Sequence, residues 1–148
     1  MKVLNLAKSA AIIGLALVSA CSEEAAAPAG TAVLSAENFT VRLNPAPGRP
    51  AGGYGVIKGP ASLALTQVTS AEVGRIELHI MEDQGGAMRM KKVDALLIDS
   101  DGTLTFEPGG RHLMLFDIAE VAVDDGQITL TAEFADSSSL TTEAQVKR

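Results

Sequence analysis

Two histidines and a group of methionines hold most of the chemistry that this 148-residue sequence offers. The only histidines, His79 and His112, each stand two residues before a methionine, Met81 and Met114 respectively. Imidazole nitrogen and thioether sulfur form a soft, uncharged donor set, which suits Cu(I) better than the cations that prefer oxygen or thiolate ligands. The four residues therefore predict a soft-metal site, and Cu(I) is the ion we expect there.

Strand periodicity indicates where these donors point. In the segment 73–81, His79 and Met81 share one face, and the opposite, apolar face carries Ile76, Leu78 and Ile80. In the segment 112–116, His112 and Met114 likewise share a face. Residues i and i+2 of a strand are about 6.6 to 6.8 Å apart, a separation that the side chains of two ligands can close. We therefore expect His79 to project away from the core.

Met88 and Met90 form a further i, i+2 pair just after a Gly-Gly turn. A lone methionine is usually a gap-filler in a core. This stretch is too polar for a fully buried strand, because the methionines are flanked by Arg89, Lys91 and Lys92. At least one of the two is therefore a predicted ligand. Met81 is a rival for the same place, because of its His-x-Met pairing with His79.

The elements that must position these residues are short strands separated by turns. From about residue 35, alternation with period two dominates, and Pro and Gly clusters interrupt it at regular intervals. Eight or so strands at this spacing predict an all-β domain, a β-sandwich or Greek-key barrel. Helical periodicity is nearly absent, and the segment 117–126 predicts at most one short helical turn. The length and the 47% apolar content indicate one domain.

The first residues carry an export signal rather than part of the fold. Lys2 and Lys8 precede an apolar run that is too short to cross a bilayer comfortably. The run ends in Leu17-Val18-Ser19-Ala20-Cys21, which resembles the bacterial lipobox and makes Cys21 the predicted lipidation site. We expect residues 1–20 to be the signal peptide, 21–35 a flexible tether and 36–148 the copper-binding β-domain. Ser22, instead of Asp, favours a periplasmic protein anchored to the outer membrane.

Composition argues against several other functions. The net charge of −6, the absence of Trp and the single Tyr give neither the basic face nor the stacking platform of a nucleic-acid-binding protein. Beyond Cys21 there is no cysteine, and both histidines already serve the predicted site, so little remains for a catalytic dyad or triad. We therefore expect no enzymatic activity.

The spacing of the donors resembles a known motif. Ten residues separate His79 from Met90, twenty-one separate Met90 from His112, and one separates His112 from Met114. This pattern is similar to the His-Met motif of the periplasmic copper chaperones of the PCu(A)C family, and the segment 106–115 resembles the family's most recognisable stretch. The resemblance implies a cupredoxin-like β-barrel and Met90 as the third ligand. It also implies a metallochaperone that delivers Cu(I) to a copper centre of cytochrome c oxidase.

Two other interpretations use the same residues. A periplasmic copper-storage or copper-tolerance lipoprotein needs the same ligands but has no dedicated oxidase recipient, and another copper-transfer protein can take the oxidase subunit's place as partner. A purely structural β-domain with incidental His and Met is the third interpretation, and it predicts no stoichiometric uptake of copper.

Overall fold

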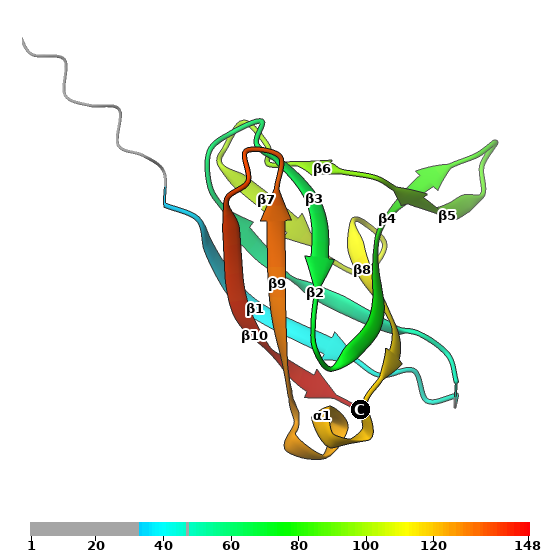
Figure 1. The fold of residues 1–148 in the computed structure, drawn as a ribbon. Helices are drawn as coiled ribbons and strands as arrows, with labels where there is room; N and C mark the ends of the chain where they lie inside the picture. Colours follow the sequence, from blue (N-terminus) through cyan, green and yellow to red (C-terminus); the bar gives the residue numbers. More distant parts are fainter. Residues whose placement is uncertain (1–32, 47) are drawn as a thin grey trace, which may run out of the picture. The chain divides into compact units, whose positions relative to one another are not determined.

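The structure is a computed structural model that describes residues 33–148 except residue 47. The predicted signal peptide, Cys21 and most of the tether lie outside the described residues. Within them the chain forms ten strands and one short helix (Figure 1). The strands are β1 (Ser35–Arg42), β2 (Ala51–Lys58), β3 (Ala64–Thr69), β4 (Val73–Asp83), β5 (Met88–Val93), β6 (Leu96–Leu97), β7 (Thr103–Phe106), β8 (His112–Ile118), β9 (Gln127–Phe134) and β10 (Ser139–Lys147), and the helix is α1 (Glu120–Asp125).

The strands form one hydrogen-bonded sheet that curls around a common interior. Its order is β5-β4-β8-β2-β1-β10-β9-β3-β6, and β7 adds to β2. β1 and β10 run parallel, whereas every other pair is antiparallel. The hydrogen-bonded order does not close between β5 and β6. The two halves of the sheet instead enclose one core, as in a sandwich.

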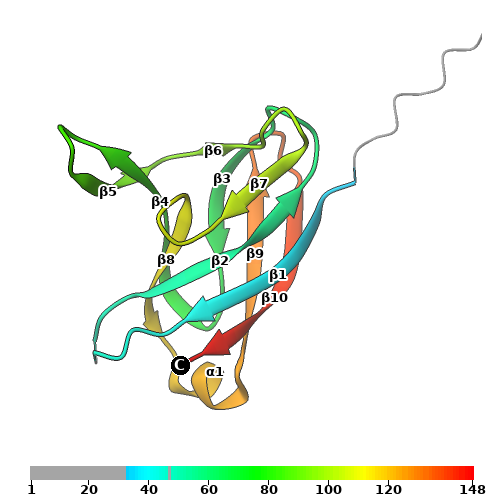
Figure 2. The same ribbon diagram turned by 180° about the vertical axis from the view of Figure 1, so that it is seen from behind.

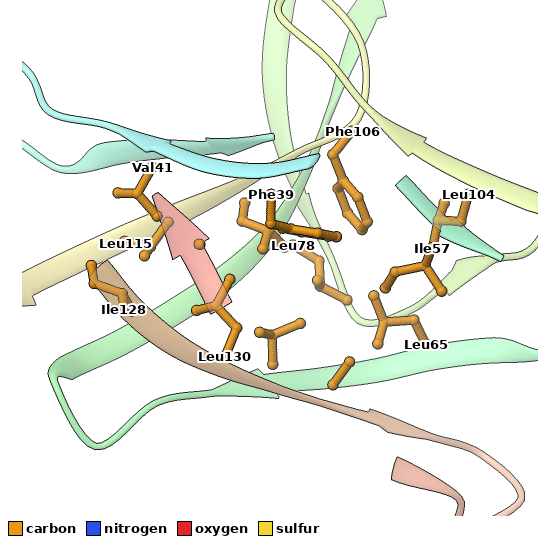
Figure 3. Packing of buried hydrophobic residues seen from close by; sticks show 14 of the residues in the cluster. Phe39, Val41, Ile57, Leu65, Leu78, Leu104, Phe106, Leu115, Ile128 and Leu130 are labelled. Carbon is orange, nitrogen blue, oxygen red and sulfur yellow. The ribbon is translucent and has the colours of Figure 1, made fainter. Parts of the chain in front are cut away.

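Alternating burial explains why these segments form strands. In β2 and β9, every second residue is buried and the residues between are more exposed, which is the pattern of a sheet with one face on a core. The buried side chains from both halves of the sheet meet in one apolar cluster (Figure 3). Its members include Phe39 and Val41 of β1, Leu65 of β3, Leu115 of β8 and Leu130 of β9.

The observed elements confirm the all-β prediction and extend it. β2 begins at Ala51, inside the Pro- and Gly-rich stretch 44–53, because Ala51 and Gly53 pair with buried leucines of β8. The short helix α1 forms although Val121 is β-branched. Ala122 is its one buried residue, and Gly126 ends the helix in the left-handed conformation (φ 73°). No helix in residues 33–46 and 48–148 is long and apolar enough to span a bilayer.

One part of the sheet departs from the rest. β4 pairs with β8 from Val73 to His79, and its second half pairs only with β5. The β4–β5 hairpin therefore projects from the body of the domain, on the same side as the β1–β2 loop, with β8 between them (Figure 2). The point at which β4 leaves β8 is the point at which both histidines stand.

Candidate metal centre

His79 and His112 are direct cross-strand partners. His79 is the last residue of β4 that pairs with β8, and His112 is the first residue of β8. Directly opposed residues point to the same face of a sheet. The two ring centroids lie 5.8 Å apart. Because a metal–imidazole bond is about 2 Å long, two rings on one ion have their centres about 5 to 6 Å apart, so this pair is already close to chelating separation.

His112 is fixed by the turn that precedes it. Its Nδ1 lies 3.0 Å from the Gly110 carbonyl oxygen, which can only accept, so Nδ1–H donates and Nε2 keeps a free lone pair. The adjacent Arg111 forms two 2.8 Å hydrogen bonds with Asp99, which hold the pKa of that carboxyl below its usual value. His112 is only 6% exposed. The turn therefore orients a buried imidazole whose Nε2 is not used by this hydrogen bond.

His79 is oriented by the carboxylate of Glu77, two residues earlier on the same face. Its Nε2 lies 3.0 Å from Glu77 Oε2. Hydrogen bonding from His79, followed by the charges of Lys92 and Arg75, holds the pKa of Glu77 below its usual value, so this carboxyl is an ionised acceptor. Nε2–H therefore donates, and Nδ1 carries the lone pair. That nitrogen is buried and has no hydrogen-bond partner among the described residues, which fits a metal ligand better than a structural histidine.

All four methionines of the motif region share the outer face with the histidines. Met90 lies opposite Met81, and Met88 lies opposite Asp83. Met114 lies opposite Glu77, diagonal to His79. Met88 and Met90 are 57% and 50% exposed, which confirms that β5 is not a core strand. Cross-strand register thus gathers the predicted donors at the place where the hairpin leaves the sheet.

A pocket distinguishes among these methionines. Met90, His112 and Met114 line one open hollow of about 420 Å³, whereas Met81 and Met88 do not line it. Tyr54 and residues of the β1–β2 loop complete its wall. His79 lies beside the hollow through its contact with the ring of His112. The arrangement thus brings together His79, Met90, His112 and Met114, the four residues of the spacing motif.

The prediction from sequence did not include Glu77 and Tyr54, two neighbours of the site. Glu77 had a visible signal, because an acidic residue two positions before a histidine on a strand shares its face. Tyr54 had no such signal, because it joins the site only through the pairing of β2 with β8. The paired residues Gly53 and Leu113 are 60 positions apart in the chain.

Solved structures with the same fold include PCuAC domains. The copper-bound PCuAC domain from PmoF2 superimposes with a TM-score of 0.60 at 22% identity, covering 77% of this chain and 92% of that one. Apo-DR1885 from Deinococcus radiodurans gives a TM-score of 0.55 at 23% identity over 97% of both chains. These likenesses confirm the cupredoxin-like β-fold that the motif implied.

Sequence comparison places the chain in a family. The uncharacterized protein RP573 of Rickettsia prowazekii (strain Madrid E) is 38% identical over 71 residues, which are 46% of this chain and 39% of that protein. The chain thus matches less than half the length of this relative. The model of the family described as "Putative lipoprotein LpqE-like" matches residues 34–146, nearly the whole of the described domain. The chain therefore belongs to the LpqE-like family.

Proposed function

We propose that this protein is a Cu(I)-binding metallochaperone whose cargo is held by His79, Met90, His112 and Met114. The observation that carries the proposal is the cross-strand pairing of the two histidines, with two thioethers in the hollow beside them. Two relatives in fold support it: one solved structure is a copper-bound PCuAC domain, and another is CuI-DR1885 from Deinococcus radiodurans, with a TM-score of 0.57 at 24% identity.

The donor set favours the monovalent ion. Two neutral imidazoles and two thioethers carry no charge, and soft sulfur donors select Cu(I) over Zn(II), which more often takes thiolate and carboxylate ligands. The hydrogen bonds to Glu77 and Gly110 use one nitrogen of each ring and leave the other, Nδ1 of His79 and Nε2 of His112, to bind the ion. These hydrogen bonds thus orient one ring nitrogen of each histidine for the ion.

The position of the site favours transfer over catalysis. The hollow is open and Met90 is half exposed, so a partner's ligand can replace this thioether first while the more buried histidines still hold the ion. A full set of four protein ligands leaves no open position for a substrate. We infer a copper centre of cytochrome c oxidase as the recipient, or else another copper-transfer protein.

Copper loading followed by transfer tests this function. The mature protein, titrated anaerobically with Cu(I) and weighed intact by mass spectrometry, should take up one ion per chain. Mixed with the apo form of an oxidase copper-binding domain, the loaded protein should pass that ion on. One bound copper without transfer would favour the storage or tolerance interpretation, and no stoichiometric copper would leave only a structural domain.

We further propose that Cys21 is acylated and holds the domain at the outer membrane on its periplasmic side. The lipobox-like sequence before Cys21 and the description of the matching family support this proposal. Several acyl chains bind a membrane firmly, because each buried methylene contributes about 0.8 kcal/mol. Cys21→Ser should therefore abolish incorporation of labelled palmitate and move the protein to the soluble fraction, and unchanged labelling would refute lipidation.

Glu77→Gln should weaken Cu(I) binding by about tenfold, the lower end of the loss usual when a hydrogen-bond partner of a metal ligand is removed. The amide can accept from or donate to the ring, so it no longer fixes the tautomer that leaves Nδ1 free. Chelator competition measures the affinity, and ¹⁵N chemical shifts of the His79 ring in the apo protein report the tautomer directly.

Glu82→Gln is the matched control for Glu77→Gln, because Glu82 is an acid of the same strand and pairs with Lys91 instead of a histidine. A mixed tautomer in Glu77→Gln with a pure one in Glu82→Gln is the expected pair of spectra. Identical ring shifts in the two variants would show that Glu77 does not position His79.

A further inference from the structure

Arginines border one side of the hollow that contains Met90, His112 and Met114. Arg42 and Arg49 line it, and no aspartate or glutamate of the described chain does. The protein as a whole is acidic, with 18 acidic and 12 basic residues. The charge at this mouth is therefore opposite to the net charge of the chain.

Strand register places Arg42 beside the predicted ligands. Arg42 of β1 lies opposite Gly52 of β2, which lies opposite Met114 of β8, so the three share the outer face. The guanidinium carbon lies 5.9 Å from the centre of the Tyr54 ring, within the range of a cation–π contact. A Cβ at Gly52 would fall 2.8 Å from Cζ of Tyr54. The glycine thus leaves the space in which the tyrosine supports the arginine.

Neither arginine is neutralised within residues 33–46 and 48–148. The lysines and arginines that form ion pairs there are others, namely Lys58, Arg75, Lys91, Lys92 and Arg111. Arg42 and Arg49 are both exposed. A guanidinium presents a planar fork of donors that matches a carboxylate, and arginine and methionine are both enriched at protein interfaces. The surface beside the hollow thus offers two unpaired carboxylate-binding groups.

We propose that Arg42, Arg49 and Tyr54 form a docking surface for an acidic segment of the protein that exchanges copper with this site. This inference rests on the proposed function and adds the chemistry of its partner. Carboxylates of the partner bind the two guanidinium groups and bring its own soft ligands over Met90 and Met114. Opposite charges at a rim act mainly on the rate of association, and salt screens them. Transfer to an acidic acceptor is therefore fast at low salt and slower at high salt.

Two synthetic acceptors test this surface. Both contain a Cys-X-X-Cys core that binds Cu(I), flanked by glutamates in one peptide and by lysines in the other. Stopped-flow mixing with the copper-loaded mature protein measures transfer. At low salt, Arg42→Glu should slow transfer to the glutamate peptide about tenfold, the lower end of electrostatic steering effects, and should speed transfer to the lysine peptide.

Lys58→Glu is the matched control because it makes the same change in net charge at the other end of the β1–β2 pair, where Lys58 lies opposite Ser35. It should change either rate by much less than Arg42→Glu does, since its charge lies farther from the hollow and the Coulomb energy falls with distance. Equal effects of Arg42→Glu and Lys58→Glu would overturn the proposal, as would rates that ignore the charge of the peptide.

A copper-free measurement separates this inference from the proposed function. The glutamate peptide with serines in place of its cysteines binds no Cu(I), and titration into ¹⁵N-labelled apo protein should shift the amides of Arg42, Arg49 and Tyr54. Localised shifts support the docking surface even if copper loading fails, in which case the proposed function alone is refuted. Absent or scattered shifts overturn the docking surface whatever the copper affinity.

Discussion

His112→Ala is expected to lower Cu(I) affinity by more than about 100-fold, because losing only the outer partner of a metal ligand already costs about 10- to 100-fold. His112 offers Nε2 as a metal ligand. The centre of its ring lies 5.8 Å from that of His79, so the two rings can bind the same ion. Competition with a chromophoric Cu(I) chelator measures the loss. An affinity within threefold of the wild type would remove His112 from the ligand set and the proposed centre with it.

Folding must be checked in this variant, because His112 is almost fully buried and its Nδ1–H satisfies the Gly110 carbonyl. A denaturation midpoint and an amide spectrum of the apo protein give that check. His79→Ala supplies the independent arm, since its side chain is 12% exposed and hydrogen bonds a neighbouring side chain instead of the turn. Both variants should lose tight binding, and at least one should keep the native spectrum.

Much of the site could be predicted because strand periodicity is a local property. Once the segment 73–81 is assigned as a strand, the alternation of Leu78 and Ile80 with His79 and Met81 already fixes which side faces the core. The structure has that arrangement, with Leu78 buried and His79 on the opposite face beside Glu77. The fold class could be predicted for the same reason, because alternating strands separated by Gly and Pro turns leave few architectures.

Register between distant strands could not be read from the sequence. Nothing local to β4 or β8 indicates that His79 and His112 end the same ladder, yet this pairing creates the site. The position of Arg42 near Met114 could not be predicted for the same reason, because it depends on two registers: Arg42 lies opposite Gly52, and Gly52 lies opposite Met114. The short helix α1 was only weakly indicated, because its helical signal is a closing glycine rather than an apolar stripe.

The choice among three methionines is the point at which sequence and structure combine. The spacing motif selects Met90 by resemblance alone, whereas the His-x-Met pairing makes Met81 a rival. Cross-strand register puts both on the outer face, directly opposite each other. Only Met90 shares the hollow with His112 and Met114. The geometry thus supports the same methionine as the spacing, from an independent observation.

Met90→Ala should accordingly lower Cu(I) affinity by about 100-fold, a loss at or beyond the upper end of what removing an outer partner costs. Met88→Ala is its matched control, because Met88 lies two positions away on the same strand and face. Met88 is 57% exposed and Met90 is 50% exposed, but only Met90 lines the hollow. Since neither truncation opens a core cavity, each should change the free energy of unfolding by no more than about 0.5 kcal/mol.

Met81→Ala completes the comparison of the three methionines, with chelator competition on all three variants under one set of conditions. Met81 lies on the strand that carries His79, opposite Met90, so its loss disturbs the neighbour of a ligand and should reduce affinity by about tenfold or less. A reversed order, with Met81→Ala the more damaging, would move the third ligand from β5 to β4. Copper would then be held by His-x-Met pairs on two adjacent strands, and the projecting hairpin would have no direct part in binding.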